Sequence, residues 1–584
     1  MLKKKWRRRP LSKTCNAWSK QQGFNDLLSV LIAGRFSDPE ILEKALLSTN
    51  KDLDLPDSLP DISKAAERVA DAIEQGEIIA LETDHDADGI TSHAVLHEVI
   101  TTYFNYPSEN LLSFIGHRLK EGYGLSDSLA QRILVNPIKP ALIITADNGS
   151  SDEPRIALLK RHGIDTIVTD HHEIPDEGIP KSAYAVVSPA RADSQYPDKM
   201  IAGCMVACLL MAMTRKILMH RGYFTETPPS VSGVFDYVAL GTVADCVSMA
   251  KSKNNRLIVK HGLRLINQAN RPCWQALKEN GKEITSTDLA FGIAPKLNAS
   301  GRLDDAMVGV EFLLSQDASQ AVEINALLDG ENQKRKEIEK NLKDEAMILA
   351  EESVKDGFTA IVTYLKNGHA GVHGIVASRL TEAFGRPSIV ISPKLGEEGV
   401  ASASARGVEG LHVRDALQYV ANKDPNILIK FGGHEGAAGL TLRVEDIPRF
   451  RKLFDEAVNQ QINESNIGPV ILTDGEIAPY YITLNTVDSF NQLQPFGRGM
   501  DAPVFEAELV VDRIRRIGNG AHLSIQFNVN GSNVKGVWFN ALDAEAEDSE
   551  IPISPSETCR VLFSMDKNFF RGQTSLQLMI KDIA

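Results

Sequence analysis

Short apolar runs alternate with helical patterns through the first half of the chain. The runs cover residues 77–83, 141–145 and 166–169, and each leads into a turn followed by apolar residues at helical spacing. Strands that alternate with helices usually form a parallel sheet, because each crossover helix returns the chain to the same end of the sheet. We therefore predict an α/β domain built on a parallel sheet.

A long charged helix is predicted over residues 326–352. This segment contains no proline and repeats apolar residues near helical spacing, with Gly330 as one weak point. A second α/β pattern follows over residues 358–460. We expect the helix to join two domains, although a surface helix within one domain fits the same pattern.

The chain changes to β character from Pro469 onward. Apolar and polar residues alternate over 523–529, and the Asn530-Gly531 pair favours a tight hairpin turn. Further β-like runs cover 534–539, 560–565 and 575–580. A small β-barrel or sandwich is predicted here.

The length of 584 residues corresponds to three or four domains, at about 100–200 residues per domain. We expect a helical segment over 1–60, the parallel-sheet domain over 61–325 and the connecting helix over 326–352. A smaller α/β domain over 353–465 and a β-domain over 466–584 complete the prediction.

Composition narrows the class of protein. A hydrophobic content of 43% with 24% charged residues is typical of a soluble globular protein. The net charge of -14 argues against a mainly electrostatic binder of duplex DNA, but not against a nuclease whose acidic site binds cations. None of the cysteines forms a C-x-x-C pair, and we predict Cys204 and Cys208 as buried free thiols rather than metal ligands, in a reducing compartment.

The apolar segments do not indicate a membrane protein. The basic N-terminus, MLKKKWRRRP, is not followed by an apolar stretch, so we do not expect it to act as a signal peptide. We expect it to be a solvated tail, with nucleic-acid contact as the alternative. The longest apolar run, over 200–213, is too short to span a bilayer and is predicted as a buried core helix, which favours a cytoplasmic location without membrane contact.

The first apolar run leads into an acidic segment. Asp84, Asp86 and Asp88 alternate before a helix expected near Thr91, so in extended backbone they would share one face. Close carboxylates repel one another unless a cation lies among them, and oxygen ligands suit magnesium or manganese. A solvated acidic turn and a calcium loop are the alternatives, but the distal glutamate of a calcium loop is missing at the required offset.

The other two runs end in similar side chains. Asp147 follows the second run, and Asp170, His171 and His172 follow the third. Sites in open α/β sheets form at the carboxyl ends of the strands, so we expect these residues to meet the acidic segment. Asp245 in GTVAD is a further candidate, with a helix-capping role as the alternative.

This donor set exceeds what one magnesium ion needs. It suits two ions about 4 Å apart that share a bridging carboxylate, an arrangement that activates water in phosphoryl transfer. The sequence therefore predicts phosphoester hydrolysis with two divalent cations, manganese or magnesium, as cofactors.

Four motifs in order, DHDADG, TADNG, TDHH and GTVAD, resemble those of the DHH phosphoesterase superfamily. LNASGRLDDA, HRLKEGYGL, GVHGIVASRL, SARGVEGLHVRDAL, GGHEGAAGL and QPFGRGMDAPVFE are similar to segments of its RecJ family. The resemblance covers the chain from Ile78 onward. It implies an α/β fold in which a parallel-sheet DHH domain is joined by the long helix to a smaller α/β DHH-associated domain, followed by a C-terminal OB-like β-barrel.

The resemblance also implies an activity. RecJ-family enzymes are metal-dependent exonucleases that degrade single-stranded DNA from the 5′ end, release mononucleotides and serve recombination and repair. Single-stranded DNA would be the partner of a monomeric enzyme, with single-strand-binding protein and a helicase as candidate protein partners.

Site residues follow from the resemblance by motif position. The implied metal ligands are Asp84, Asp86, Asp88, Asp147, His171 and Asp245, with Asp147 as the bridging carboxylate. The implied catalytic set consists of His171, His172 and Asp170. His172 would hydrogen-bond the scissile phosphate or a ligand, and Asp170 would orient the two histidines. Glu82 stands where related phosphatases carry a ligating histidine and receives no role, and Thr83 stands where the RecJ family usually has glycine.

Substrate contacts are predicted from arginines and from small residues. Arginine suits bidentate contact with phosphate, and Arg302, Arg379 and Arg406 all lie beside small residues, although a solvated arginine is always an alternative. The resemblance implies phosphate contacts for Arg379, Ser404 and Arg406, and a 5′-end sensor in Arg118.

Two further segments are substrate candidates. Gly432 and Gly433 allow close approach of a phosphate to the backbone, and the adjacent His434 favours this role over an ordinary turn. Tyr123 would stack on a base, with a buried core tyrosine as the alternative.

Two alternative functions remain at this stage. Another DHH phosphoesterase, acting on short oligonucleotides or cyclic dinucleotides, would lack the β-rich region after Pro469. A non-catalytic replisome scaffold of the same fold would not need the aspartates and histidines, all of which are present.

Overall fold

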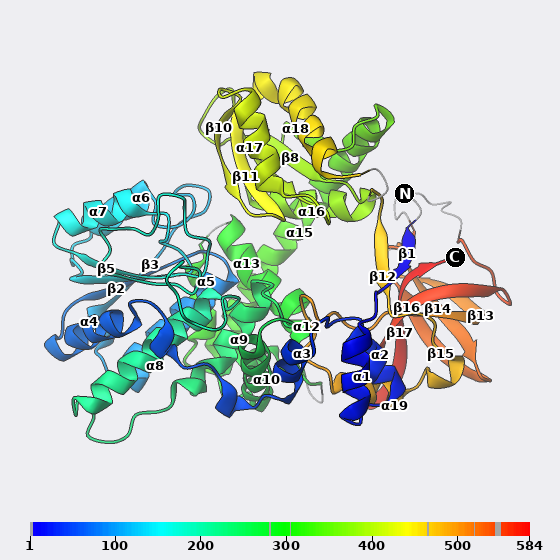
Figure 1. Cartoon of the computed structure of the whole chain (residues 1–584), viewed down its shortest axis with the longest axis horizontal. Coiled ribbons are helices and arrows are strands. Elements are labelled where there is room, and N and C mark those ends of the chain that lie inside the picture. The colour runs from blue at the N-terminus through cyan, green and yellow to red at the C-terminus, as the bar shows by residue number, and fades with distance from the viewer. Residues whose placement is uncertain are drawn as a thin grey trace.

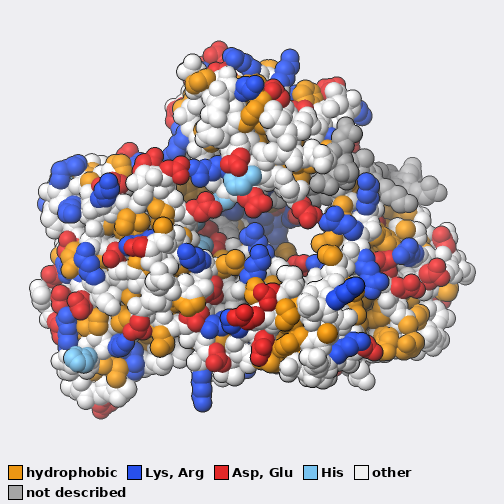
Figure 2. Space-filling model, in the orientation of Figure 1, with side chains coloured by type: hydrophobic (Ala, Val, Ile, Leu, Met, Phe, Trp, Pro, Cys, Tyr) orange, Lys and Arg blue, Asp and Glu red, His pale blue; other side chains and the backbone are white. Residues whose placement is uncertain are grey.

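The computed structural model describes residues 4–279, 282–303, 305–463, 467–518, 520–542, 551–570 and 572–584. Figure 1 shows two α/β domains and a β-barrel arranged around the middle of the molecule. The space-filling surface is hollowed where they meet, and acidic, basic and histidine side chains gather there (Figure 2). The domain boundary expected between 465 and 466 lies outside the described residues.

The first α/β domain contains a parallel sheet in the order β3-β2-β4-β5-β6. Its strands are β2 (Ile79–Thr83), β3 (Leu111–Ile115), β4 (Leu142–Ala146), β5 (Asp165–Thr169) and β6 (Ala185–Val187). The three predicted runs became the adjacent strands β2, β4 and β5, and they are buried on both faces, as parallel sheets require.

Helices cover both faces of this sheet. One side packs against α4 (Ile62–Gln75), α5 (Ala87–Glu98), α8 (Gly203–His220) and α9 (Phe235–Ala244). The other side packs against α6 (Asp127–Leu134) and α7 (Glu153–Arg161). The remaining helical segments of this domain are η3 (Val99–Tyr103), η4 (Ser108–Asn110), η5 (Val231–Val234), α10 (Lys253–Gln268), α11 (Pro272–Leu277), α12 (Ser286–Asp288), η6 (Leu289–Ile293), α13 (Ala294–Leu303) and α14 (Met307–Leu313).

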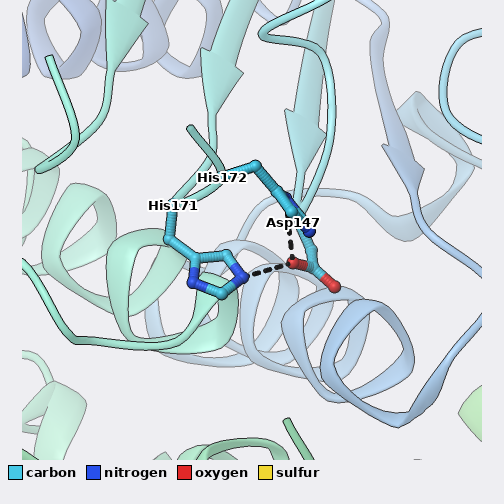
Figure 3. Close-up of side chains that lie close together, drawn as sticks. All are labelled: Asp147, His171 and His172. Carbon is cyan, nitrogen blue, oxygen red and sulfur yellow. Dashed lines mark ion pairs between the residues drawn. The ribbon is translucent and has the colours of Figure 1, made fainter. Parts of the chain in front are cut away.

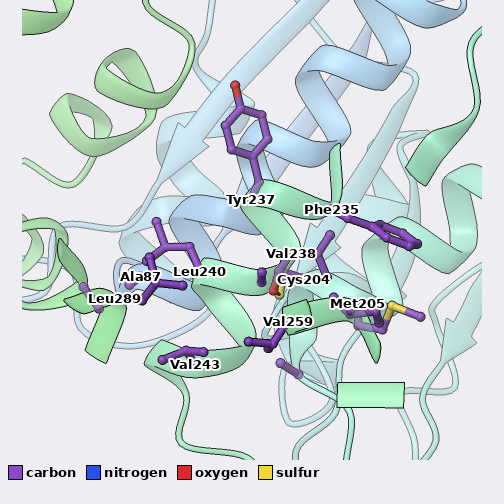
Figure 4. Packing of buried hydrophobic residues seen from close by; sticks show 14 of the residues in the cluster. Ala87, Cys204, Met205, Phe235, Tyr237, Val238, Leu240, Val243, Val259 and Leu289 are labelled. Carbon is purple, nitrogen blue, oxygen red and sulfur yellow. Dashed lines mark hydrogen bonds between the residues drawn. The ribbon is translucent and has the colours of Figure 1, made fainter. Parts of the chain in front are cut away.

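Helix α8 is the predicted core helix. By length and composition it is apolar enough to cross a membrane, but 67% of it is buried inside the protein. Cys204 and Met205 pack among Val238 and Leu240 of α9 (Figure 4). Cys204 and Cys208 are buried free thiols, as predicted.

Helix α15 (Ala318–Lys355) joins the two α/β domains. Its first part contacts α11, α13 and α14, and its later part contacts β7 (Ile361–Tyr364) and α16 (His373–Phe384) of the second domain. The helix begins at Ala318, earlier than predicted, and runs unbroken through Gly330. The alternative of a helix within one domain is therefore wrong.

The second α/β domain has a mixed sheet in the order β10-β11-β9-β8-β7. Its further elements are η7 (Ala370–Val372), β8 (Ser388–Pro393), β9 (Val400–Arg406), α17 (Val413–Lys423), β10 (Leu428–Gly433), β11 (Ala437–Arg443), η8 (Val444–Asp446) and α18 (Ile447–Gln461). Helices α15 and α16 cover one face of the sheet, and α17 and α18 cover the other.

The C-terminal region forms a closed barrel in the order β13-β14-β15-β17-β16, so the barrel prediction is confirmed over the sandwich. Its strands are β13 (Phe505–Ile517), β14 (His522–Val529), β15 (Ser532–Trp538), β16 (Thr558–Phe570) and β17 (Gln573–Ile583), preceded by η10 (Pro479–Tyr481) and α19 (Leu484–Asn491). Asn530 and Gly531 have φ values of 51° and 80°, which the tight turn between β14 and β15 requires.

The N-terminal segment corrects one expectation. Besides α1 (Lys13–Gln21), α2 (Asp26–Ala33), α3 (Pro39–Leu47), η1 (Asn50–Asp52) and η2 (Pro56–Ser58), it contains strand β1 (Lys5–Arg8). β1 pairs in parallel with β12 (Val470–Thr473), and the Trp6 indole donates to Asp582 at 2.7 Å. Residues 5–9 are therefore not a free solvated tail, because their backbone hydrogen bonds are made to a segment far away in the sequence.

Candidate metal centre and nucleic-acid site

Strand register explains why the acidic motifs meet. Thr83 of β2 is the partner of Ala146 of β4, and Ala146 is the partner of Thr169 of β5. Because three adjacent parallel strands end at the same level, the residues that follow them emerge side by side. Asp84, Asp147 and Asp170 are these residues.

The acidic segment is not extended, which corrects the prediction that its three aspartates share one face. Helix α5 begins at Ala87, and Asp86 is its N-cap, accepting hydrogen bonds from the backbone N–H groups of Asp88 and Gly89. A Cβ at Gly89 would lie 2.1 Å from the carbonyl oxygen of Asp84, so this tight turn needs glycine. The turn separates the three aspartates into two groups of potential metal ligands. Asp88 belongs to the first group, with His171 and Asp245, and Asp84 and Asp86 belong to the second, with Asp147.

Asp88 is held by the start of helix α8. Its two carboxylate oxygens accept hydrogen bonds from the backbone N–H groups of Gly203 at 2.7 Å and Cys204 at 2.9 Å. A helix N-terminus carries partial positive charge and favours an ionised carboxylate. Asp88 is therefore fixed in place although it is buried.

His171 is the centre of the first group of ligands. Its Nε2 atom lies 3.2 Å from Asp147 Oδ1, 3.7 Å from Asp245 Oδ2 and 3.9 Å from Asp88 Oδ2. Figure 3 shows the His171 ring pointing at the Asp147 carboxylate, and its dashed lines join one oxygen of that group to both His171 and His172.

Asp147 also belongs to the second group, in which oxygens of Asp84, Asp86 and Asp147 lie within 4.8 Å of one another. Its backbone has a φ of 65°, a left-handed conformation that is strained for a residue with a side chain. Asp147, whose backbone is strained, is therefore shared by the two groups of donor atoms.

The donor set fits divalent cations. Asp147 Oδ1 and His171 Nε2 are buried without a hydrogen-bond partner among the described residues. Burial, and then repulsion by Asp88 and Asp86, raises the pKa of Asp147 well above its usual range. Leaving such groups unpaired costs several kcal/mol, which cations among the oxygen and imidazole ligands would offset.

Asp245 shows the same pattern at the end of a helix. It is the C-cap residue of α9, so the capping alternative holds for its position, but its carboxylate faces His171. The C-terminal end of a helix carries partial negative charge, which disfavours a carboxylate. Burial, and then repulsion by Asp88 and Asp86, also raises its pKa well above the usual range.

Asp170 organises the two histidines. Its Oδ1 atom accepts hydrogen bonds from His172 Nδ1 and from the backbone N–H of His171, both at 2.7 Å, and its Oδ2 accepts one from the Ser150 N–H. Burial opposes the charged imidazole, but the hydrogen bond and the charge of Asp170 outweigh it and raise the pKa of His172 to about 9. His172 is thus a hydrogen-bond donor beside the metal ligands.

A basic cluster adjoins the metal centre through His85. His85 Nδ1 lies 2.8 Å from Asp84 Oδ1, and its Nε2 lies 3.3 Å from Arg118 Nη1. The Arg118 guanidinium lies over the Tyr123 ring at 4.8 Å from its centroid. Tyr123 is 62% exposed, so the buried-core alternative is wrong. No role was predicted for His85 from the sequence, although its place inside the acidic motif was a signal.

Arg302 and Arg406 extend this cluster. Arg302 donates to the Gly371 carbonyl at 2.8 Å, and burial followed by repulsion from Arg118 lowers its pKa to about 10. Burial also lowers the pKa of Arg406, which Arg118 repels as well. Within the described ranges neither arginine forms an ion pair, so this group of neighbouring cations suits an anion.

The other predicted contacts are more dispersed. Ser404 lies two positions before Arg406 on β9, opposite Gly439. Arg379, on α16, forms ion pairs with Glu339 at 3.2 Å and Glu382 at 3.0 Å, so carboxylates already surround its guanidinium.

His434 faces the metal centre from the second α/β domain. Its ring stacks on His172 with centroids 6.4 Å apart, and its Nδ1 lies 3.4 Å from Glu173 Oε2. The preceding Gly432 and Gly433 end β10, and Gly433 has a φ of 146°, where a Cβ would lie 2.4 Å from the Ala437 oxygen. Because β10 ends with these two glycines, the next residue, His434, lies against His172 of the first α/β domain.

Known proteins share this arrangement. Family models match residues 78–242 (DHH family, N-terminal domain), 357–460 (DHHA1 domain) and 473–582 (RecJ OB domain). The single-stranded-DNA-specific exonuclease RecJ of Haemophilus influenzae is 35% identical over 549 residues, which span 92% of this chain and 93% of that protein. The Escherichia coli protein of the same name is 33% identical over 90% of both chains.

Solved structures agree with this order of domains. RecJ from Thermus thermophilus in complex with Mn²⁺ superposes with a TM-score of 0.76 at 23% identity, covering 99% of this chain and 79% of that chain. An exonuclease RecJ bound to manganese gives a TM-score of 0.56 at 28% identity, covering 69% of this chain and 96% of that chain.

A parallel sheet that gathers aspartates and histidines at its carboxyl edge, followed by a DHHA1 domain, defines the class as a DHH-type phosphoesterase. The match to the RecJ OB domain distinguishes this chain from the shorter DHH phosphoesterases, which lack a barrel. The chain belongs to the RecJ family of single-stranded-DNA-specific exonucleases.

Proposed function

We propose that this protein is a metal-dependent exonuclease that hydrolyses single-stranded DNA from the 5′ end and releases 5′-mononucleotides. The observation that carries the proposal is the buried pair Asp147 Oδ1 and His171 Nε2, which have no hydrogen-bond partner in the described chain and are surrounded by carboxylates. The RecJ relatives, which are exonucleases specific for single-stranded DNA, support the same activity.

Two divalent cations, manganese or magnesium, complete the proposed site. RecJ structures have been solved with each of these ions. The proposed ligands are Asp84, Asp86, Asp88, Asp147, His171 and Asp245. When bound, such ions activate a water molecule and stabilise negative charge on a phosphate.

The protein's own side chains position the DNA. His172, held by Asp170, whose charge raises the pKa of the imidazole, donates a hydrogen bond to an oxygen of the scissile phosphate. This contact stabilises charge that grows during hydrolysis. His434 stacks on His172 from the second domain and contributes a second polar ring to the phosphate path, alongside the backbone of Gly432 and Gly433.

The basic cluster gives the proposed polarity. Arg118, Arg302 and Arg406 bind the 5′-terminal phosphate, and Ser404 adds a hydroxyl group near Arg406. Tyr123, which is exposed beneath Arg118, stacks on the terminal base. Since this anion site adjoins Asp84 through His85, a strand enters the metal centre with its 5′ end leading.

Arg379 and the cellular setting are further parts of the proposal. Arg379 contacts the DNA backbone only when a phosphate replaces its Glu339 or Glu382 partner. We place the enzyme in recombination and repair in the cytoplasm, as a monomer that works with single-strand-binding protein and a helicase. The curated relatives named above are bacterial proteins.

The test is a digestion of single-stranded DNA labelled at either end, with Mn²⁺, with and without a 5′ phosphate. We expect label at the 5′ end to be released first, faster when the 5′ phosphate is present, and not from blunt duplex DNA. Asp147→Ala should abolish release. Earlier loss of the 3′ label would overturn the polarity, and equal cleavage of duplex would overturn the strand selectivity.

A further inference from the structure

We infer that Arg498 forms a second phosphate subsite, which binds the DNA phosphate immediately 3′ to the scissile one. The inference rests on the proposed function and assigns a residue to it that neither the acidic motifs nor the basic cluster includes. Arg498 lies in the loop that leads into the barrel, in the segment QPFGRG.

Arg498 lines a cavity of about 470 Å³ where three parts of the chain meet. Glu173 lines it from the first α/β domain, and His434 lines it from the second. Because these two residues flank His172 and the metal ligands, the cavity begins beside the reacting phosphate. A strand that passes the metal centre therefore has this cavity next to it.

Arg498 is the only Lys or Arg among the residues that line the cavity. Of the lining carboxylates, Glu173 faces His434 at 3.4 Å and Glu409 pairs with Arg7 at 2.9 Å. In the part of the chain that the structure describes, no carboxylate lies within ion-pair distance of Arg498, which is exposed. Arg498 is therefore the lining cation that remains available to a phosphate in this cavity.

Arg498 is also close to the metal centre. It shares the lining of the cavity with Glu173, the residue after His172, and with His434, whose ring stacks on His172. The basic cluster of Arg118, by contrast, adjoins Asp84. The two cationic positions therefore adjoin different parts of the site, Asp84 in one case and the His172–His434 pair in the other.

The loop that carries Arg498 is fixed. The carbonyl of Arg498 accepts a hydrogen bond from the Met249 N–H at 2.9 Å, four residues after Asp245. A Cβ at Gly497 would lie 2.8 Å from Met249 Cγ, so the loop packs closely on this segment.

The buried Arg256 holds the start of the same loop. Its guanidinium donates to the carbonyls of Leu493 at 2.9 Å, Gln494 at 3.2 Å and Pro495 at 3.1 Å. The backbone of Arg498 is thus anchored to the first α/β domain, so only its side chain has to become ordered when it binds a phosphate.

The test combines a protein variant with a modified substrate. Arg498→Ala and wild type are compared on a 5′-phosphorylated single strand and on the same strand with one neutral methylphosphonate directly 3′ to the first scissile phosphate. Release of the first nucleotide is measured in a single turnover. A third strand carries the methylphosphonate far from the 5′ end, and Arg264→Ala, which removes an exposed arginine from α10, is the matched protein control.

We expect Arg498→Ala to lower kcat/KM on the unmodified strand about tenfold, mainly through KM. The neutral linkage should cost wild type a similar factor and should cost Arg498→Ala nothing further, because both changes remove the same contact. Arg264→Ala and the distant methylphosphonate should change neither value, and thermal unfolding of Arg498→Ala should match wild type.

Two results would overturn the inference in distinguishable ways. The subsite is wrong, and the proposed function stands, if wild type releases nucleotides normally and Arg498→Ala releases them at the same rate. The same conclusion follows if the loss from Arg498→Ala and the loss from the neutral linkage multiply. If wild type cleaves none of the strands, the proposed function fails and the inference fails with it.

Discussion

One added methyl group tests whether Asp147 is the residue on which the metal centre depends. Gly203 is the first residue of α8, and its N–H donates to Asp88. A Cβ at this position would lie 2.7 Å from both Cβ and Oδ1 of Asp147. Gly203→Ala therefore inserts a carbon where the carboxylate stands.

The magnitude follows from the distances. Carbon atoms in contact prefer about 3.5–4.0 Å, so the carboxylate or the helix must move by about 1 Å. Misplacement by about 1 Å can cost about 100-fold in rate. Overpacking costs about 1–3 kcal/mol, and alanine favours a helix over glycine by up to about 1 kcal/mol, so the net loss of stability is expected to be about 2 kcal/mol or less.

The assay measures nucleotide release from single-stranded DNA against Mn²⁺ concentration, with calorimetric titration of Mn²⁺ and thermal unfolding in parallel. We expect Gly203→Ala to lose about 100-fold in kcat/KM, with weaker Mn²⁺ binding, while it remains folded. The control is Gly330→Ala on α15, where a Cβ meets nothing within 4 Å and stability should rise without change in activity. Gly203→Ala with wild-type activity and Mn²⁺ affinity would refute the reasoning.

Three further predictions concern protons and a buried cation. Mn²⁺ binding to the metal-free protein near neutral pH should release protons, because burial and then repulsion by Asp88 raise the pKa of Asp147. Binding enthalpies that are identical in buffers of different ionisation enthalpy would contradict this prediction. Arg256→Met should destabilise the fold by about 3 kcal/mol or more, since buried carbonyls lose their donor, and Arg256→Lys should not restore the melting temperature, because one ammonium group cannot reach them all. Burial, and then the charges of His369 and Arg118, lower the pKa of His373 to about 4. The stability that the neutral His373 ring contributes is therefore complete above the unfolded pKa of about 6.5, and up to about 3 kcal/mol of it is lost as the pH falls toward 4. Thermal unfolding of wild type and His373→Gln from about pH 7 to pH 4 should converge as the pH falls; a constant difference would exclude the effect.

Much of the fold could be predicted from local pattern. The runs that became β2, β4 and β5 were recognisable because strands buried on both faces are continuously apolar. The turn at Asn530-Gly531 was recognisable because few residue pairs adopt two successive left-handed conformations. Helix α15 followed from its helical spacing and its lack of proline.

The conformation of the acidic segment could not be predicted in the same way. Alternating aspartates fit an extended strand, but the capping bonds from Asp86 begin a helix and rotate Asp88 toward α8. The strand β1 was missed because four basic and aromatic residues carry no strand pattern until β12 is beside them. His85 and Arg498 were missed because isolated residues have no periodicity.

The sequence by itself determined which elements form and which side chains are available as ligands, since helix, strand and turn propensities act between residues near in the chain. Only the tertiary structure decided which of those side chains meet. Asp88 lies at the N-terminus of α8, His434 lies on His172 and Arg498 lies beside Met249 because segments more than a hundred residues apart pack together. Such contacts depend on the mutual burial of whole faces and on strand register, and neither quantity is written in any single stretch of sequence.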